Sequence, residues 1–433
     1  MSHVTANGLP DLIPVRQRLW SKRAVDLDGQ VDRLLRASRL GRRIRPGFTV
    51  AVAAGSRGVA NVDRIVERVV GTVRALGGDA FVVPAMGSHG GGTADGQAQI
   101  LAELGVTEAR VGAPIRSSME VEQIGQTDDG MPVYCDRNAL SADAIVVVNR
   151  VKKHTDINAP IESGLIKMIS IGLGKKAQAD LIHAYGAPGL RTYIPLVARV
   201  TLARAPIALG IATLENGYEE TAEVHAFEPE EIEAGERRLL VRNKRLLPRL
   251  PFDEIDLLVV ERMGKEISGT GMDTNVLGRY RIPGEAEPRR PRVKFVLVLD
   301  LTDASHGNAI GVGLADLTTE RLVGKIDRQA TYVNGITSGF LERAKIPITL
   351  PTDRAALETA LARLSPARRE RPRVARILDT LHLAEFAVSP PLLDEARAPL
   401  EVVGEARPLA FEPDGTLPPS NGAHASAREP ALV

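Results

Sequence analysis

The sequence predicts an α/β protein made of two α/β domains with mostly parallel sheets. Short apolar runs of strand length alternate with amphipathic segments of helix length, which is typical of such sheets. Glycine-rich turns separate the strands from the segments that follow them. The chain has 433 residues, 44% of them hydrophobic, so two or three domains with buried cores are expected.

Three predicted strands in the first half end in loops that carry charged or imidazole side chains. These strands are residues 47–54, 80–85 and 143–148. Arg57 follows the first, His89 the second and His154 the third. A helical pattern from Val62 to Val73 separates the first two strands. Because ligands of open parallel sheets bind at the carboxyl ends of strands, we expect these three residues at one edge.

The domain boundary is expected near residue 250. A long charged amphipathic helix over 229–250 closes the first domain, residues 1–250. The second domain, residues 251–404, has predicted strands at 256–260, 294–300 and 346–350. Residues 405–433 are rich in Pro, Ala, Ser and Gly and are expected to form a disordered tail. We expect the active-site cleft between the two domains.

Composition argues against several classes of protein. The 55 Lys and Arg residues balance 54 Asp and Glu residues, and aromatic residues make up only 3%. These values argue against nucleic-acid binding. The single cysteine, Cys135, excludes a disulfide framework and a multi-cysteine zinc site. No membrane span or signal peptide is apparent, so we expect a cytoplasmic protein with no membrane partner.

Known sequence motifs give no direct function. There is no G-x-G-x-x-G after the first strand, no Walker A motif, no H-E-x-x-H and no G-x-S-x-G. Nicotinamide binding, P-loop nucleotide hydrolysis and nucleophile-elbow chemistry therefore lack support. The candidates for chemistry are histidine, lysine and arginine side chains.

Three of the eight histidines lie in distinctive contexts: His89 in a glycine-rich loop, His154 after two lysines, and His183 in a lysine-rich segment. One such histidine alone is more often structural. Two at strand ends of one sheet, with Arg57 at a third, favour a joint role. Paired imidazoles can exchange acid and base roles on a small substrate, which suits a reversible isomerisation. Arg57 has the planar fork that matches a carboxylate.

Lys167 stands in an apolar run, residues 165–171. Such a lysine either extends to solvent or is partly buried, and a buried amine loses its charge more readily and becomes a nucleophile. Lys175 and Lys176 follow a Gly172–Gly174 turn, where they are alternative candidates for holding a phosphate.

With these residues in view, the chain resembles the nickel-pincer-nucleotide lactate racemase family and its 2-hydroxy-acid racemase and epimerase relatives. The resemblance covers most of residues 45–365 and implies an isomerase. It implies a nickel-pincer nucleotide cofactor, pyridinium-3,5-bisthiocarboxylic acid mononucleotide nickel, covalently attached at Lys167. It further implies His183 as the nickel ligand.

The resemblance also assigns the substrate residues. It implies that His89 and His154 act as the acid/base pair and that Arg57 binds the substrate carboxylate. The implied reaction transfers the α-hydride of a 2-hydroxy acid to the cofactor and back. The partners are then the small 2-hydroxy acid and the cofactor-assembly enzymes. We also assign Ser56 and Gly58, which flank Arg57, to the cofactor site.

Other residues have open roles. Lys265, after the strand 256–260, is a candidate second contact to the substrate carboxylate or a surface lysine. Asp273 and Asn275 are candidates for polar substrate contacts, and His306 either lines the cleft or forms a turn. Glu162 is a candidate to face the cofactor ribose or an extra substrate hydroxyl, and its role is open as well.

Two alternative functions remain open at this point. One is a zinc or iron hydrolase or lyase in which His89, His154 and His183 bind the metal directly. The other is a carboxylate- or nucleotide-binding protein without turnover.

Overall fold

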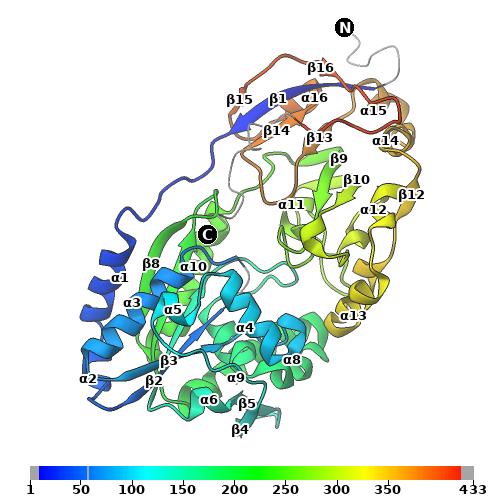
Figure 1. Cartoon of the computed structure of the whole chain (residues 1–433). Helices are drawn as coiled ribbons and strands as arrows, with labels where there is room; N and C mark the ends of the chain where they lie inside the picture. The colour runs from blue at the N-terminus through cyan, green and yellow to red at the C-terminus, as the bar shows by residue number, and fades with distance from the viewer. Residues whose placement is uncertain (1–8, 56–57, 421–433) are drawn as a thin grey trace. The chain divides into compact units, whose positions relative to one another are not determined.

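A computed structural model describes residues 9–55 and 58–420. Contacts between residues divide the chain into two compact units, coloured along the sequence in Figure 1. The N-terminal unit is Trp20–Leu247, and the C-terminal unit combines Pro248–Val433 with Met1–Leu19. Within the described residues, no helix has both the length and the apolar character needed to cross a membrane.

The N-terminal unit is built on a sheet with strand order β3-β2-β6-β7-β8. Its strands are β2 (Thr49–Ala54), β3 (Asp79–Pro84), β6 (Ala144–Arg150), β7 (Ile207–Glu215) and β8 (Thr221–Phe227). The first four are parallel to their neighbours, and β8 pairs antiparallel with β7. The predicted strands 47–54, 80–85 and 143–148 are confirmed, with ends shifted by no more than two residues.

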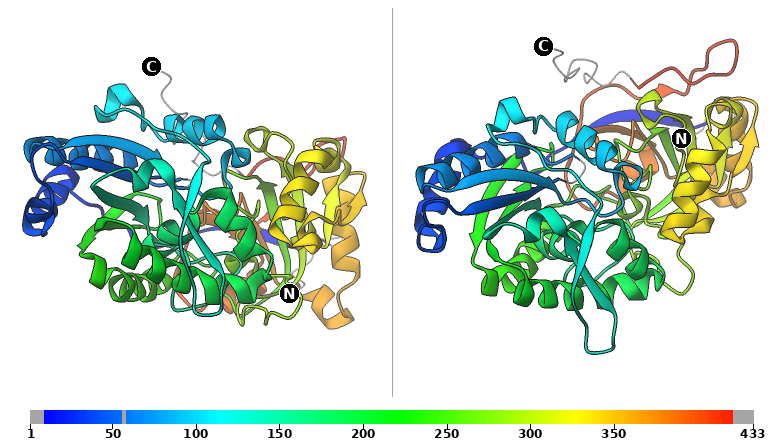
Figure 2. Two further views of the ribbon diagram at one scale, coloured as in Figure 1. Left: turned by 90° about the horizontal axis from the view of Figure 1, so that it is seen from below. Right: turned by 60° about the horizontal axis from the view of Figure 1, so that its bottom comes forward.

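The helices of this unit connect the strands and cover the sheet. They are α1 (Leu27–Ala37), α2 (Leu40–Arg43), α3 (Val62–Ala75), α4 (Ala94–Glu103), α5 (Glu108–Val111), α6 (Arg137–Leu140), α7 (Leu165–Lys167), α8 (Lys175–His183), α9 (Gly186–Arg204) and α10 (Ile232–Leu246). Helix α3 buries the apolar face that its spacing predicts, and this face packs in one core with alternate residues of β2. A separate hairpin, β4 (Val121–Gln126) and β5 (Pro132–Asp136), projects from the unit in Figure 2.

Cys135 lies in this hairpin with its side chain completely buried. Burial, reinforced by the neighbouring Asp136 carboxylate, raises the pKa of the thiol to about 12. Thiolate is the reactive form, so we expect no reaction of the folded protein with Ellman's reagent at pH 8. Unfolding in urea should expose the thiol and give full colour. A rapid reaction of the native protein would contradict this burial.

The C-terminal unit contains a sheet with strand order β12-β11-β10-β9-β13-β14-β1-β15, and β16 pairs with β1. Its strands are β1 (Asp11–Gln17), β9 (Glu254–Met263), β10 (Arg292–Leu301), β11 (Leu317–Thr319), β12 (Ile348–Leu350), β13 (Val374–Ile377), β14 (Glu385–Val388), β15 (Leu400–Val402) and β16 (Arg407–Pro408). Its helices are α11 (Thr274–Leu277), α12 (Glu320–Gly324), α13 (Arg328–Ser338), α14 (Asp353–Ala362), α15 (Pro366–Glu370) and α16 (Pro390–Asp394). The strands from β12 to β13 run parallel.

The two chain ends differ from the sequence-based expectation. Residues 1–250 are expected to form one domain, but strand β1 pairs antiparallel with β14 and β15 of the C-terminal unit. Its Val15 side chain is completely buried in that unit's core, which explains the placement. In the expected tail 405–433, β16 pairs with β1 and Leu417 is buried. Residues 421–433 lie outside the described residues.

Candidate functional site

Lys167 ends the short helix α7, where the backbone changes to a π-helical turn, η2 (Met168–Gly172). Turns of this kind are rare and frequently mark functional sites. Lys167 is half-buried, and its neighbours in the chain, Ile166 and Met168, are buried. Burial lowers the pKa of its amine, and the charge of Asp156 offsets this only in part. The amine is therefore more available as a neutral nucleophile than that of an ordinary lysine.

The Lys167 amine lies against His154. Its Nζ is 2.7 Å from the His154 Nε2. The other ring nitrogen, Nδ1, accepts a hydrogen bond of 3.0 Å from the backbone N–H of Asp156. A neutral ring that accepts at Nδ1 carries its proton on Nε2, so Nε2 donates to a neutral Lys167 amine. This arrangement agrees with the lowered pKa of the lysine.

His183 stands at the end of α8, sixteen positions after Lys167. Its Nδ1 is buried and has no hydrogen-bond partner among the described residues. Burial is the main cause that lowers the pKa of the ring. A neutral imidazole with an unshared lone pair is the form that binds a transition metal.

His89 lies in the loop after β3, at the same sheet edge as His154 after β6. Strand β2 separates these two strands, so their ends are about 10 Å apart. The loop also packs on the π turn: the Gly87 N–H donates to the Gly172 carbonyl at 3.3 Å. A Cβ at Gly87, which has φ +63°, would approach Ile171 Cγ2 to 2.7 Å. Glycine is therefore required where the His89 loop meets the turn after Lys167.

Lys175 is not a phosphate ligand candidate in this structure. It is completely buried, pairs with the equally buried Asp136 at 2.8 Å, and contacts Gln97 Oε1 at 3.3 Å. Gln97 donates in turn to the carbonyls of Gly87 and His89. The buried lysine therefore anchors the His89 loop. The exposed Lys176 pairs with Asp180.

The loop after β2 contains the predicted carboxylate and cofactor contacts. Ser56 and Arg57 lie outside the described residues, so their roles stay predictions. The Gly58 carbonyl accepts a hydrogen bond of 2.7 Å from Arg150 Nη1. Arg150 also pairs with Glu215, which accepts from the Ala60 N–H at 2.8 Å. This network secures the end of the loop, and a cofactor contact at Gly58 stays a prediction.

Glu162, a candidate to face the cofactor ribose or a substrate hydroxyl, bonds to the loop that carries His154. Its buried carboxylate accepts the backbone N–H groups of His154 and Ala159, at 2.8 and 2.9 Å. It also pairs with Lys244 at 2.5 Å. All its contacts stabilise the loop that carries His154.

Lys265 follows β9 in the C-terminal unit. Its Nζ donates to Asn334 Oδ1 at 2.9 Å and to the Gly269 carbonyl at 2.5 Å. Its substrate role stays a prediction. Asp273 caps α11 by accepting the Asn275 backbone N–H, and its Oδ1 also accepts from the Asn275 side chain. These two residues thus bond to each other.

His306 and His382 also belong to the C-terminal unit. His306, with φ +47°, ends a short 3₁₀ turn, which favours the turn interpretation. The sequence indicates a surface or packed histidine at His382, and its Nδ1 lies 2.9 Å from both oxygens of the buried Asp379. Burial alone raises the pKa of Asp379, but hydrogen bonds from His382 hold it below its ordinary value.

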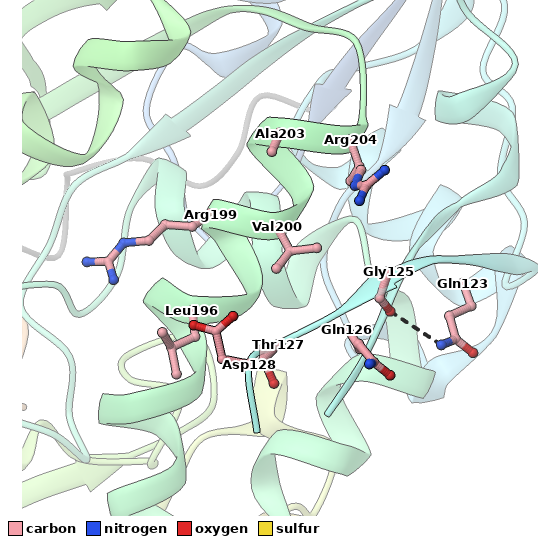
Figure 3. A pocket seen from close by; sticks show the side chains of 10 residues that line it. All are labelled: Gln123, Gly125, Gln126, Thr127, Asp128, Leu196, Arg199, Val200, Ala203 and Arg204. Atoms are coloured by element: carbon pink, nitrogen blue, oxygen red, sulfur yellow. Dashed lines mark hydrogen bonds between the residues drawn. The ribbon is translucent and has the colours of Figure 1, made fainter. Parts of the chain in front are cut away.

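The described residues do not gather three His, Cys, Asp or Glu side chains into a group placed to hold a metal ion. The structure therefore gives no support to the alternative in which His89, His154 and His183 converge on one ion. A cavity of about 550 Å³ opens beside the β4–β5 hairpin and α9, as Figure 3 shows. None of the candidate site residues lines it.

Comparisons with known proteins concern the family and the fold of the chain. Residues 29–185 match the family model of the lactate racemase N-terminal domain. This range includes His89, His154, Lys167 and His183. A search of curated proteins finds no match.

The fold is also similar to a solved structure, the lactate racemase apoprotein from Thermoanaerobacterium thermosaccharolyticum. The TM-score is 0.52 at 13% sequence identity, and the alignment covers 85% of this chain and 94% of that chain. At this identity the match shows the fold alone, and it agrees with the predicted α/β fold class.

Proposed function

We propose that this protein is a 2-hydroxy-acid racemase or epimerase, because residues 29–185 match the family model of the lactate racemase N-terminal domain, in agreement with the resemblance to that family. We further propose that it uses a nickel-pincer nucleotide, supplied by cofactor-assembly enzymes. The observation that carries the proposal is the 2.7 Å contact between Lys167 Nζ and His154 Nε2. It places a candidate covalent anchor beside a candidate acid/base.

The residues present suit such a cofactor. Lys167 would hold it through a thioamide, and the lowered pKa of the amine favours that bond. His183 would bind the nickel, and its Nδ1 has no hydrogen-bond partner among the described residues. The bound cofactor supplies a reversible hydride acceptor.

The side chains then handle the protons and the carboxylate. A thioamide nitrogen at Lys167 would not accept a hydrogen bond from His154 Nε2. His154 Nε2 would then be available to the substrate. In the proposal, His89 and His154 lie on opposite faces of the 2-hydroxy acid: the ring without a proton on its substrate-facing nitrogen takes the hydroxyl proton, and the other ring gives a proton to the keto oxygen on the opposite face. His154, with its proton on Nε2, is the acid for one direction, and the two rings exchange roles for the reverse direction. Arg57 and Lys265 bind the carboxylate.

The test uses protein produced together with cofactor-assembly enzymes. We expect stoichiometric nickel, a mass gain at Lys167, and racemisation of at least one member of a 2-hydroxy-acid panel, followed by optical rotation or α-deuterium exchange. Active protein with neither nickel nor added mass would overturn the proposal. Metal without added mass would instead favour a histidine-ligated metal enzyme. Ligand binding that survives His89→Ala, with no racemisation by any preparation, would favour a binding protein.

A further inference from the structure

Helix α10 lies beyond the residues that match the family model, yet it contacts the segment that carries the candidate chemistry. That segment runs from residue 153 to residue 167. It is a loop closed by a bridge between Lys152 and Ser163, followed by the short helix α7. Three polar side chains of α10, Glu236, Asn243 and Lys244, bond to it.

The first contact is at the start of α7. Glu236 is completely buried, and its Oε2 accepts the Ile166 backbone N–H at 2.8 Å. Gly164 packs directly on this carboxyl group, since a Cβ there would lie 2.5 Å from Glu236 Cδ. Burial raises the pKa of Glu236 to about 7, so a neutral carboxyl group is accessible at physiological pH. A helix as short as α7 depends on such contacts for its position.

The other two contacts are at the His154 end of the segment. Asn243 Oδ1 accepts the Lys153 backbone N–H at 2.9 Å. Lys244 pairs with Glu162 at 2.5 Å and donates to the Ala159 carbonyl at 2.9 Å. Glu162 in turn accepts the His154 N–H at 2.8 Å. A chain of hydrogen bonds thus joins α10 to the His154 backbone.

Both ends of the segment are therefore fixed to one rigid element. The residues of α10 that hold them are seven or eight positions apart, which is about two helical turns or roughly 11 Å. We propose that α10 sets the separation of His154 and Lys167, with Glu236 and Lys244 as positioning residues. This assignment rests on the proposed function only because it treats His154 and Lys167 as the reactive pair.

The test compares Lys244→Met with Lys244→Arg and with Arg245→Met, an exposed neighbour on the same helix. The first readout is the ¹⁵N resonance of His154 Nε2 in protein without cofactor. We expect Lys244→Met to shift this resonance towards that of a ring free of Lys167, Lys244→Arg to restore it in part, and Arg245→Met to leave it unchanged. An unchanged His154 resonance in Lys244→Met would overturn the proposal.

The second readout is kinetic. In cofactor-loaded enzyme, we expect Lys244→Met to lower kcat by about 10- to 100-fold with little change in KM, because misplacement of a reacting group by an ångström costs this much. A rise in KM of about 10- to 100-fold with unchanged kcat would contradict the role of Lys244 as a positioning residue. If the wild-type enzyme has no racemase activity, the proposed function fails while the resonance still decides the role of α10.

Glu236 is tested by a conservative change, because removal of a buried group risks misfolding. Glu236→Gln keeps an oxygen that accepts the Ile166 N–H, whereas Glu236→Leu does not. We expect the glutamine variant to keep the His154 resonance and the leucine variant, where it folds, to shift it. If Glu236→Gln shifts the His154 resonance as much as Lys244→Met does, the acceptor oxygen of Glu236 does not have this role.

Discussion

Replacing Lys175 with methionine should destabilise the folded protein by about 3–5 kcal/mol, because it leaves the partner charge buried and uncompensated. Lys175 and Asp136 are both completely buried and lie 2.8 Å apart. The same amine also bonds to the carbonyl of Pro84, at the end of β3. Methionine has a similar volume, so the loss reports the charge rather than a cavity. Urea denaturation followed by circular dichroism measures the free energy of unfolding.

Lys176 is the matched control for this experiment. It is the next residue, and its ion pair with Asp180 is about half exposed on both sides. Exposed pairs on one helix contribute about 0.3–0.5 kcal/mol, so Lys176→Met should be nearly neutral. The double variant Lys175→Met/Asp136→Leu should regain part of the loss, because no unpaired charge remains. Equal effects of the two lysine substitutions would show that Lys175 is not a buried ion-pair partner.

The strands of the N-terminal sheet could be predicted from the sequence because parallel strands are buried on both faces. Such strands appear as continuous apolar runs, and the residues of β2 and β6 are almost all buried. The loops that follow the predicted strands, with Arg57, His89 and His154, were therefore identified from the sequence. Strand β1 escaped this reasoning because its partners, β14 and β15, lie more than 360 positions away. Nothing local in the sequence specifies so distant a pairing.

For the charged residues, too, position in the chain could be predicted from the sequence, whereas their distant partners could not. Lys167 was conspicuous because it interrupts an apolar run, but its contact with His154 depends on how the loop between them closes. Glu162 and Lys175 were candidates for ligand contacts because their chemistry suits ribose and phosphate. Their partners, Lys244 and Asp136, lie 82 and 39 positions away, so the buried ion pairs that they form appear only in the fold.

Replacing His154 with asparagine should lower kcat for racemisation by about 10²–10⁴-fold, the usual contribution of a general acid or base. Asparagine is the closest substitute for the structural half of the ring. Its Oδ1 occupies the place of Nδ1, which accepts the Asp156 N–H at 3.0 Å, but it has no group in the place of Nε2. The change should therefore leave the loop folded while removing the nitrogen that lies 2.7 Å from Lys167. Steady-state racemisation kinetics of cofactor-loaded protein measure the effect.

Mass spectrometry separates this role from cofactor attachment. His154→Asn should keep the mass gain at residue 167 and the nickel, whereas Lys167→Met should lose the mass gain together with all activity. His225 gives the matched control. It lies on β8, and its Nε2 is 3.2 Å from the Glu223 carboxylate. His225→Asn should retain full activity. Wild-type kcat in His154→Asn would remove His154 from the acid/base pair. Loss of the mass gain in that variant would instead assign the ring to attachment of the cofactor, since the neutral amine that it contacts is the nucleophile.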